Sequence, residues 1–324
     1  MQPLRTIRRI PLATVPTPLH SVPRLAAHAG LEKLYIKRDD LTGFAGGGTK
    51  VRKLEYDFAE IISKQHDAVV TAGGMQSNLV RLAAAVAARY GIPMKAVLGG
   101  PVPAKKEGNL LLNDLFGAEI RLLPDDDDNQ HMTAMAEAWV EELRQQGADP
   151  YLLPIGGSTP LGSLGCIAVM DELAAELGDQ SPVQIVLPVG SCGTFAGLLF
   201  GARLAMPNAR IIGISISRTA AAIRTRTEEL FHGCNALLGT GHALTAADVE
   251  CYDTFHDVYG VPTPAAQEAQ TDAARMEGLL LDPVYTAKAM SGLLALARQG
   301  VLAKELPTIF LHTGGTPILF TSGA

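Results

Sequence analysis

The chain has 324 residues and a formal net charge of −6, and hydrophobic residues make up 47% of it while aromatic residues make up 5%. This length allows one or two large cores, and the charge gives no support for a nucleic-acid partner or an anionic membrane surface. We find no signal peptide or membrane span, and the four scattered cysteines, without C-x-x-C spacing, indicate free thiols in a reducing cytoplasm and no metal site.

Strand and helix patterns alternate along the chain. We predict strands at 33–37, 68–71, 94–98, 119–123, 151–153, 183–189 and 308–311, and helices at 53–64, 78–90, 109–116, 133–146 and 195–200. The acidic run 125–128 indicates a solvated loop or a helix start. This order predicts an α/β fold with parallel sheets and helices on both faces.

Glycine-rich breaks divide this pattern near Gly46 and Gly156. They predict a small inserted α/β domain at residues 47–158. The remaining residues, 1–46 and 159–324, are then expected to form a large cofactor-binding domain.

The most informative segment is Gly46-Gly47-Gly48-Thr49-Lys50, which precedes an apolar helical pattern. Glycines let the backbone pass close to a bulky ligand. A lysine held there can act as a nucleophile if a partly apolar pocket lowers its pKa. The alternative is a solvated lysine in an ordinary loop.

A second segment, Gly190-Ser191-Cys192-Gly193-Thr194, lies between a strand pattern and an apolar helix pattern. Strand, tight turn and helix N-terminus together bind phosphate in many α/β proteins, although an ordinary turn has the same pattern. The segment from Gly43 to Lys50 reads G-x-x-x-x-G-T-K, which reverses the order that a nucleotide-binding loop requires. Nucleotide binding is therefore the weaker account of both loops.

Further small-residue loops follow predicted strands at 73–78 and 312–316, and the segment 281–286 leads into a helix. Ligands of open parallel sheets bind at the carboxyl ends of the strands. Ser77 could cap a helix, bind an anion or handle a proton. These loops and Lys50 predict a pocket between two domains.

The chain resembles the family of pyridoxal-phosphate enzymes that contains D-cysteine desulfhydrase and 1-aminocyclopropane-1-carboxylate deaminase. The resemblance covers nearly the whole chain, in the family's order. It is carried by residues 36–41, 47–55, 73–78, 156–158, 190–194, 259–262, 281–288 and 311–315. It implies fold type II of these enzymes, similar to the tryptophan synthase β subunit, with two open twisted parallel-type sheets around a cofactor cleft.

The resemblance also implies residue roles. Lys50 would form the Schiff base with pyridoxal 5'-phosphate and later take the α-proton, and the loop from Gly190 to Thr194 would hold the phosphate. Asn78 would bond the ring hydroxyl oxygen, and Ser77 would meet the substrate carboxylate or relay a proton. Tyr259 and Tyr285 would flank the substrate, with packed core tyrosines as the alternative for either, and Thr286 would face the pyridine nitrogen.

Thr286 bears on the reaction, because the deaminase branch has glutamate after the tyrosine. A threonine hydroxyl cannot stabilise a protonated pyridine as a carboxylate does. The weaker electron sink favours β-elimination, and hence a D-cysteine desulfhydrase activity that yields pyruvate, ammonia and sulfide. The alternatives are an L-cysteate sulfo-lyase, a 1-aminocyclopropane-1-carboxylate deaminase and, outside the family, a catalytically silent cofactor- or small-molecule-binding protein.

We expect a small amino-acid substrate with a β leaving group and a cytoplasmic homodimer. Two residues depart from the family pattern: Thr49 replaces the usual asparagine before the lysine, and Leu79 replaces a frequent histidine. Leu79 removes a titratable group close to the expected substrate site, so the preferred substrate could differ.

Overall fold

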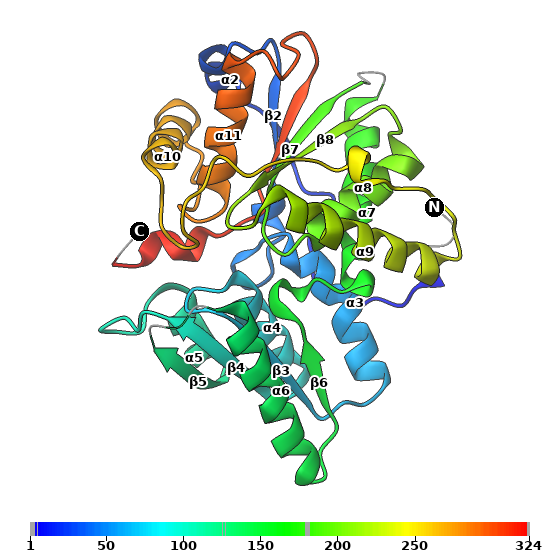
Figure 1. The fold of residues 1–324 in the computed structure, drawn as a ribbon, viewed down its shortest axis with the longest axis vertical. Helices are drawn as coiled ribbons and strands as arrows, with labels where there is room; N and C mark the ends of the chain where they lie inside the picture. The colour runs from blue at the N-terminus through cyan, green and yellow to red at the C-terminus, as the bar shows by residue number, and fades with distance from the viewer. Residues whose placement is uncertain (1–3, 5, 125, 127, 179–181, 323–324) are drawn as a thin grey trace.

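The computed structural model describes residues 4, 6–124, 126, 128–178 and 182–322. Its strands form two sheets, one in the upper and one in the lower half of Figure 1. This arrangement confirms the predicted α/β fold class.

The larger sheet has six strands and is parallel except at one edge. Its order is β1 (Leu19–Ser21), β2 (Leu34–Lys37), β10 (Thr308–Leu311), β7 (Gln184–Val189), β8 (Arg210–Ser215) and β9 (Glu250–Tyr252). The edge strand β1 pairs antiparallel with β2 and was not predicted, because three residues carry too little periodicity.

The smaller sheet is wholly parallel, in the order β5 (Glu119–Pro124), β4 (Met94–Gly100), β3 (Ala68–Gly74) and β6 (Pro150–Leu153). All of its strands lie inside the predicted insertion, 47–158. The exact domain boundaries stay a prediction.

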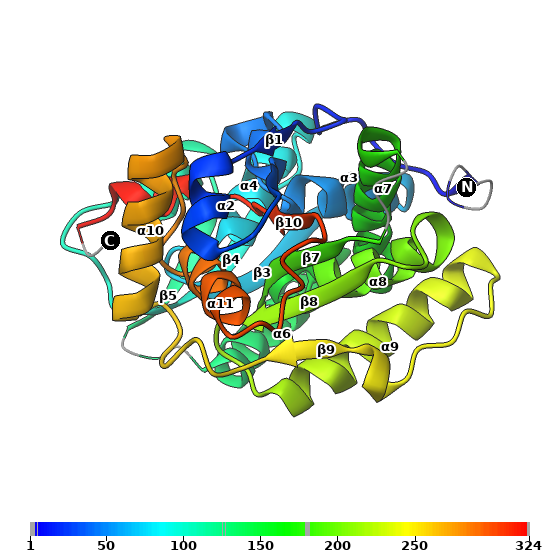
Figure 2. The same cartoon turned by 90° about the horizontal axis from the view of Figure 1, so that it is seen from above.

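Helices cover both faces of each sheet, as Figures 1 and 2 show. On the large sheet, α2 (Pro23–Ala29), α10 (Pro264–Glu277) and α11 (Thr286–Arg298) pack on one face, and α7 (Pro160–Leu177), α8 (Gly193–Ala205) and α9 (Ala220–Leu238) on the other. On the small sheet, α3 (Lys50–Ser63), α4 (Asn78–Tyr90) and α5 (Gly108–Leu115) face α6 (Asn129–Gln145) across the strands.

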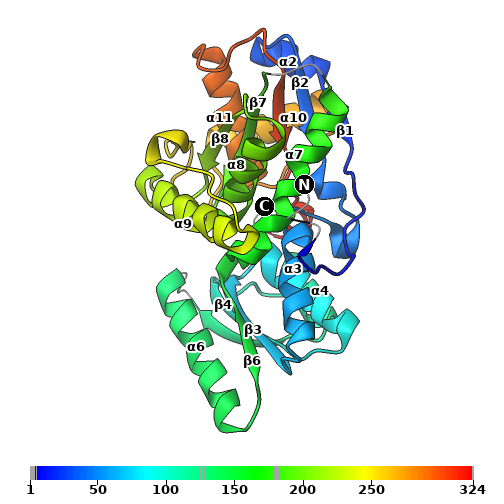
Figure 3. The same cartoon turned by 90° about the vertical axis from the view of Figure 1, so that its right-hand side faces the viewer.

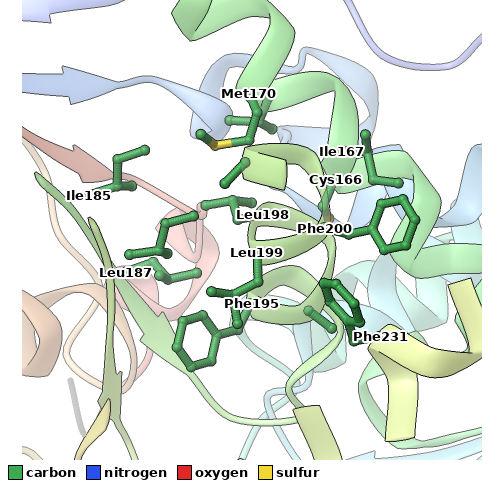
Figure 4. Close-up of a cluster of buried hydrophobic side chains, with 14 of the residues drawn as sticks. Cys166, Ile167, Met170, Ile185, Leu187, Phe195, Leu198, Leu199, Phe200 and Phe231 are labelled. Carbon is green, nitrogen blue, oxygen red and sulfur yellow. The ribbon is translucent and has the colours of Figure 1, made fainter. Parts of the chain in front are cut away.

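The largest core lies between β7 and the helices α7, α8 and α9 (Figure 4). Phe195 and Leu198 of α8 are fully buried there, and the rings of Phe200 and Phe231 lie 5.0 Å apart. This packing holds the N-terminus of α8 at the carboxyl end of β7.

Helix α3 connects the two halves of the molecule, as Figure 3 shows. It packs against α7 at Gly165, where an added Cβ would lie 2.0 Å from the carbonyl oxygen of Arg52. A close helix contact of this kind requires glycine. The first residue of α3, Lys50, is therefore held against the large half of the chain.

Two predicted helices begin three or more residues earlier than expected. The helix predicted at 53–64 begins at Lys50, because Val51 and Arg52 already donate backbone hydrogen bonds to Gly48 and Thr49. The helix predicted at 133–146 begins at Asn129, because the Asp128 carboxylate caps it by accepting from Gln130 N–H. The acidic run thus contains a helix cap, while its residues 125 and 127 lie outside the described residues.

Among the described helices, none has both the length and the apolar character needed to cross a bilayer.

Candidate active site

A cavity of about 500 Å³ lies between the two sheets. It collects loops that follow strands of both sheets, as expected for parallel α/β architecture. The predicted site residues that line it are Lys50, Ser77, Gly190, Ser191, Cys192, Thr194, Tyr259 and Tyr285. The other three predicted residues, Asn78, Gly193 and Thr286, are not among the residues that line the cavity.

Lys50 projects into the cavity from the first turn of α3. Burial and then the positive charge of Lys53 lower the pKa of Lys50 from 10.5 to about 8. Its Nζ lies 5.4 Å from the ring centroid of Tyr285. An amine with this pKa is partly unprotonated near neutrality, which a nucleophilic or basic lysine requires.

The glycine turn before Lys50 has a backbone path that only glycine follows without strain. Gly47 has φ +69°, and an added Cβ would lie 2.0 Å from the carbonyl oxygen of Asp40. The guanidinium of the buried Arg81 donates to the carbonyl oxygens of Gly47 and Ala45. The N–H of Thr49 donates to Thr313 O at 3.0 Å. The turn therefore fixes where Lys50 points.

The loop from Gly190 to Thr194 leads from β7 into the 13-residue helix α8. Cys192 caps this helix in a left-handed conformation, with φ +70°, which is uncommon outside glycine and often occurs at functional sites. The N–H groups of the first helical turn have no helical acceptors, and the helix dipole adds positive potential there. The loop can therefore accept an anion.

Lys53 supplies a cation beside this loop, and the sequence reasoning did not assign it a role. Its Nζ donates to Gly156 O at 2.7 Å and to Ser158 Oγ at 2.9 Å. A methyl group on Gly193 would lie 2.6 Å from that Nζ. The signal was available, because Lys50 and Lys53 are three residues apart and so share one helix face.

Ser158 connects Lys53 to the anion-accepting loop. Its hydroxyl donates to Ser191 Oγ at 2.7 Å and accepts from the N–H of Gly193 at 3.2 Å. The glycine-rich stretch that contains Gly156 and Ser158 thus packs against the loop from Gly190 to Thr194.

Ser77 and Asn78 begin helix α4 at the opposite wall. The Ser77 hydroxyl caps the helix by accepting from Val80 N–H at 3.3 Å, and it also lines the cavity. The Asn78 side-chain oxygen accepts from Asn109 Nδ2 at 2.9 Å. Because that oxygen is occupied, the Asn78 amide N–H₂ is the group left to meet a ligand.

Tyr259 and Tyr285 form a hydrogen-bonded pair at the cavity wall. Their hydroxyl oxygens are 2.6 Å apart, and their rings meet at 77°. Burial first, and then the neighbouring Tyr259, raise the pKa of Tyr285 well above its ordinary 10. Tyr285 therefore keeps its proton at neutral pH and can donate it.

Thr286 is fully buried, and its hydroxyl is bound to Asp282. It donates to Asp282 Oδ1 at 2.7 Å and accepts from the Asp282 N–H at 2.8 Å. The carboxylate of Asp282 also accepts from the backbone N–H groups of Tyr285 and Thr286, and so caps α11. Because the Thr286 hydroxyl carries a single proton, it would have to release Asp282 in order to donate to an unprotonated pyridine nitrogen.

The two departures from the family pattern lie in different surroundings. Thr49 is buried and donates to Asp39 Oδ2 at 2.9 Å, inside an ionic cluster with Arg52. Leu79 is buried but lines the cavity. Of the two, only Leu79 is placed to affect substrate choice directly.

Among the residues that the structure describes, no group of three or more His, Cys, Asp and Glu side chains is placed to hold a metal ion.

The chain is similar to known proteins over nearly its whole length. A family model described as pyridoxal-phosphate dependent enzyme matches residues 10–314. The D-cysteine desulfhydrases of Salmonella choleraesuis and Salmonella newport are each 40% identical over 332 aligned residues, covering 98% of this chain and 98% of the relative.

Comparison with solved structures also finds similar proteins. An ACC deaminase homologue superposes with a TM-score of 0.91 at 34% identity, over 98% of this chain and 95% of its own. Maize serine racemase, with a TM-score of 0.69 and 18% identity over 97% and 94% of the two chains, shares the fold.

Proposed function

This chain belongs to the pyridoxal-phosphate dependent enzyme family, and from that premise we propose that it is a carbon–sulfur lyase that converts D-cysteine to pyruvate, ammonia and sulfide. The observation that carries the proposal is the placement of Lys50, with its pKa of about 8, in one cavity with an anion-accepting helix N-terminus and a tyrosine pair. The 40% identity to D-cysteine desulfhydrases supports the choice of substrate.

The residues present fit the cofactor. Its aldehyde requires a lysine with a lowered pKa, which Lys50 supplies, and its phosphate requires an anion site. We assign the phosphate to the loop from Gly190 to Thr194, with Lys53 as its cation. Asn78 would donate its free amide N–H to the ring oxygen.

Bound pyridoxal phosphate supplies an electron sink for the bond broken at Cα. Lys50 takes the proton from Cα, and Ser77 with the N-terminus of α4 binds the substrate carboxylate. Tyr285 donates its proton to the departing sulfur, while Tyr259 orients that hydroxyl. The Cβ–S bond breaks with its electron pair on sulfur, and water then releases pyruvate and ammonia from the remaining carbon skeleton.

Thr286 supports elimination over ring opening. Opening a cyclopropane without an α-proton requires a stronger electron sink than expelling a thiolate, and no carboxylate stands at position 286 itself. The L-cysteate sulfo-lyase alternative keeps the same chemistry with a different leaving group.

A substrate panel tests this proposal. Ammonia release, which all of these reactions share, should be fastest with D-cysteine when L-cysteine, L-cysteate and 1-aminocyclopropane-1-carboxylate are offered at equal concentration. Faster turnover of the cyclopropane would contradict the argument from Thr286, since its products require the stronger sink. Faster turnover of L-cysteate would change the assigned substrate but would still support the proposed β-elimination.

We also propose a cytoplasmic homodimer. The four cysteines are buried and unpaired, as in a reducing compartment. Leu111 and Leu115 are exposed residues one helical turn apart on α5, which contacts η5 (Thr316–Phe320), and Leu115 is 69% and Phe320 72% exposed. Exposed apolar residues gathered in this way mark interaction surfaces, and a self-complementary patch suits a twofold dimer.

Light scattering should therefore give twice the chain mass of 34.2 kDa. Leu115→Glu should shift the protein to the monomer mass, because it places a charge in the interface. The control is Leu237→Glu on α9, another exposed leucine, which should remain dimeric. An unchanged mass for Leu115→Glu would exclude this face as the interface.

A further inference from the structure

The cavity continues into a second hollow of about 400 Å³. The two spaces share Asn129 and Gln130 of α6, Ile155, Ser191 and Arg218. A three-carbon substrate such as cysteine is too short to occupy both spaces together. The second hollow is therefore available to a group that extends beyond Cβ of the substrate.

Arg218 lies where the two spaces join, in the loop after β8. Its backbone is fixed, because its N–H donates to Ser215 Oγ at 2.9 Å and its carbonyl oxygen accepts from the same hydroxyl at 2.6 Å. The Arg218 side chain therefore extends from a loop whose backbone is held by hydrogen bonds.

Arg218 is partly buried, yet no hydrogen bond or ion pair engages its guanidinium within the described part of the chain. Acidic side chains do face these spaces, Asp128 in the cavity and Glu137 in the second hollow, but neither forms an ion pair with it. A partly buried guanidinium with five free donors is suited to a carboxylate, sulfonate or phosphate.

The other arginine of the hollow differs. Arg226 donates to Ser158 O at 3.0 Å and pairs with Glu229 at 2.8 Å. The phosphate loop already has its own cation in Lys53. Arg218 is therefore the cation that the assignment of the cofactor site leaves unused.

We propose that Arg218 forms a subsite for an anionic group on the substrate side chain. This inference rests on the proposed elimination activity and extends its substrate class to β-substituted amino acids whose leaving group carries a carboxylate, sulfonate or phosphate. For an S-carboxymethyl thioether, Lys50 takes the α-proton, the Cβ–S bond breaks with its electrons on sulfur, and mercaptoacetate leaves. Water then converts the remaining skeleton to pyruvate and ammonia.

The test compares S-carboxymethylcysteine with S-carbamoylmethylcysteine, which has the same size but no charge, in both enantiomers. The measured quantity is the ratio of kcat/KM for the acid to that for the amide. The native enzyme should favour the acid, and Arg218→Gln should reduce the ratio about ten- to hundred-fold, the effect of losing a hydrogen-bonded charge partner. The change should appear in KM, and Arg218→Lys should restore part of it.

Arg226→Gln is the matched control, and it should keep the native ratio because its guanidinium already has protein partners. If Arg218→Gln and Arg226→Gln reduced the acid-to-amide ratio equally, the ratio would reflect the overall positive charge of the hollow. That result would overturn the role of Arg218. A native ratio near one would exclude the subsite, while D-cysteine turnover would leave the proposed function intact. Loss of bound cofactor from Arg218→Gln with an unchanged ratio would assign Arg218 to the phosphate instead.

If neither thioether nor D-cysteine is turned over, the proposed elimination fails. The dissociation constants of the acid and the amide, measured by the change in cofactor absorbance, still test the subsite in that case. The subsite is supported if the native protein binds the acid more tightly than the amide and Arg218→Gln removes this difference. Equal dissociation constants for the acid and the amide in the native protein would overturn the subsite.

Discussion

Lys50→Ala should give a folded protein that no longer forms a borohydride-trappable link with pyridoxal phosphate and no longer releases pyruvate. Loss of a positioned proton-transfer group alone costs about a hundred- to ten-thousand-fold in rate, and the covalent link is lost as well. Peptide mapping after reduction should place the native label on Lys50. Circular dichroism checks that the fold persists.

Lys288→Ala is the matched control, because Lys288 is also a buried lysine but donates to Val258 O and does not line the cavity. The Lys288→Ala variant should keep the borohydride-trappable link to pyridoxal phosphate. A label that persists in Lys50→Ala and maps to Lys53 or Lys288 would show that Lys50 is not the attachment site.

The pH dependence of cofactor attachment follows from the same lysine. Only the neutral amine attacks an aldehyde, and the pKa of Lys50 is lowered from 10.5 to about 8 by burial and then by Lys53. Attachment to the apoprotein should therefore accelerate as pH rises and level off above about 8. A rate that keeps rising toward pH 10 would indicate an ordinary, solvated lysine.

The second large effect is expected at Tyr285. If its hydroxyl protonates the departing sulfur, Tyr285→Phe should slow D-cysteine turnover by about a hundred- to ten-thousand-fold. Burial and the bond to Tyr259 keep the Tyr285 proton in place at neutral pH. Steady-state pyruvate release measures the effect.

β-Chloro-D-alanine provides the control substrate, because chloride leaves without a proton. Tyr285→Phe should spare its elimination. Tyr259→Phe should cost less than Tyr285→Phe with D-cysteine, since it removes only the orienting partner. Equal losses with both substrates would mean that Tyr285 binds or packs and does not transfer the proton.

Local sequence patterns predicted most of the architecture, because parallel strands read as short apolar runs and their helices as longer periodic ones. The edge strand β1 was not predicted, because its three residues are too few to carry a pattern of their own. Its register comes from pairing with β2. The start of α3 was misplaced because glycines usually end regular structure, whereas here the turn leads directly into the first helical bonds.

The site was predictable where one segment carries the chemistry, as at Lys50 and the loop from Gly190 to Thr194. It was not predictable where distant side chains combine. The open guanidinium of Arg218 becomes evident only once loops of both sheets meet at one cavity. The sequence likewise could not show that Asp282 engages the Thr286 hydroxyl, because that contact depends on the geometry of the α11 cap.

The central position of β10 bears on the order in which the chain can fold during synthesis. The small sheet is complete once residue 153 has been made, but the large sheet lacks a middle strand until residues 308–311 arrive between β2 and β7. The loop that follows β10 also accepts the N–H of Thr49 through Thr313. The segment that carries the reactive Lys50 thus reaches its working position only after residues 308–313 have been translated.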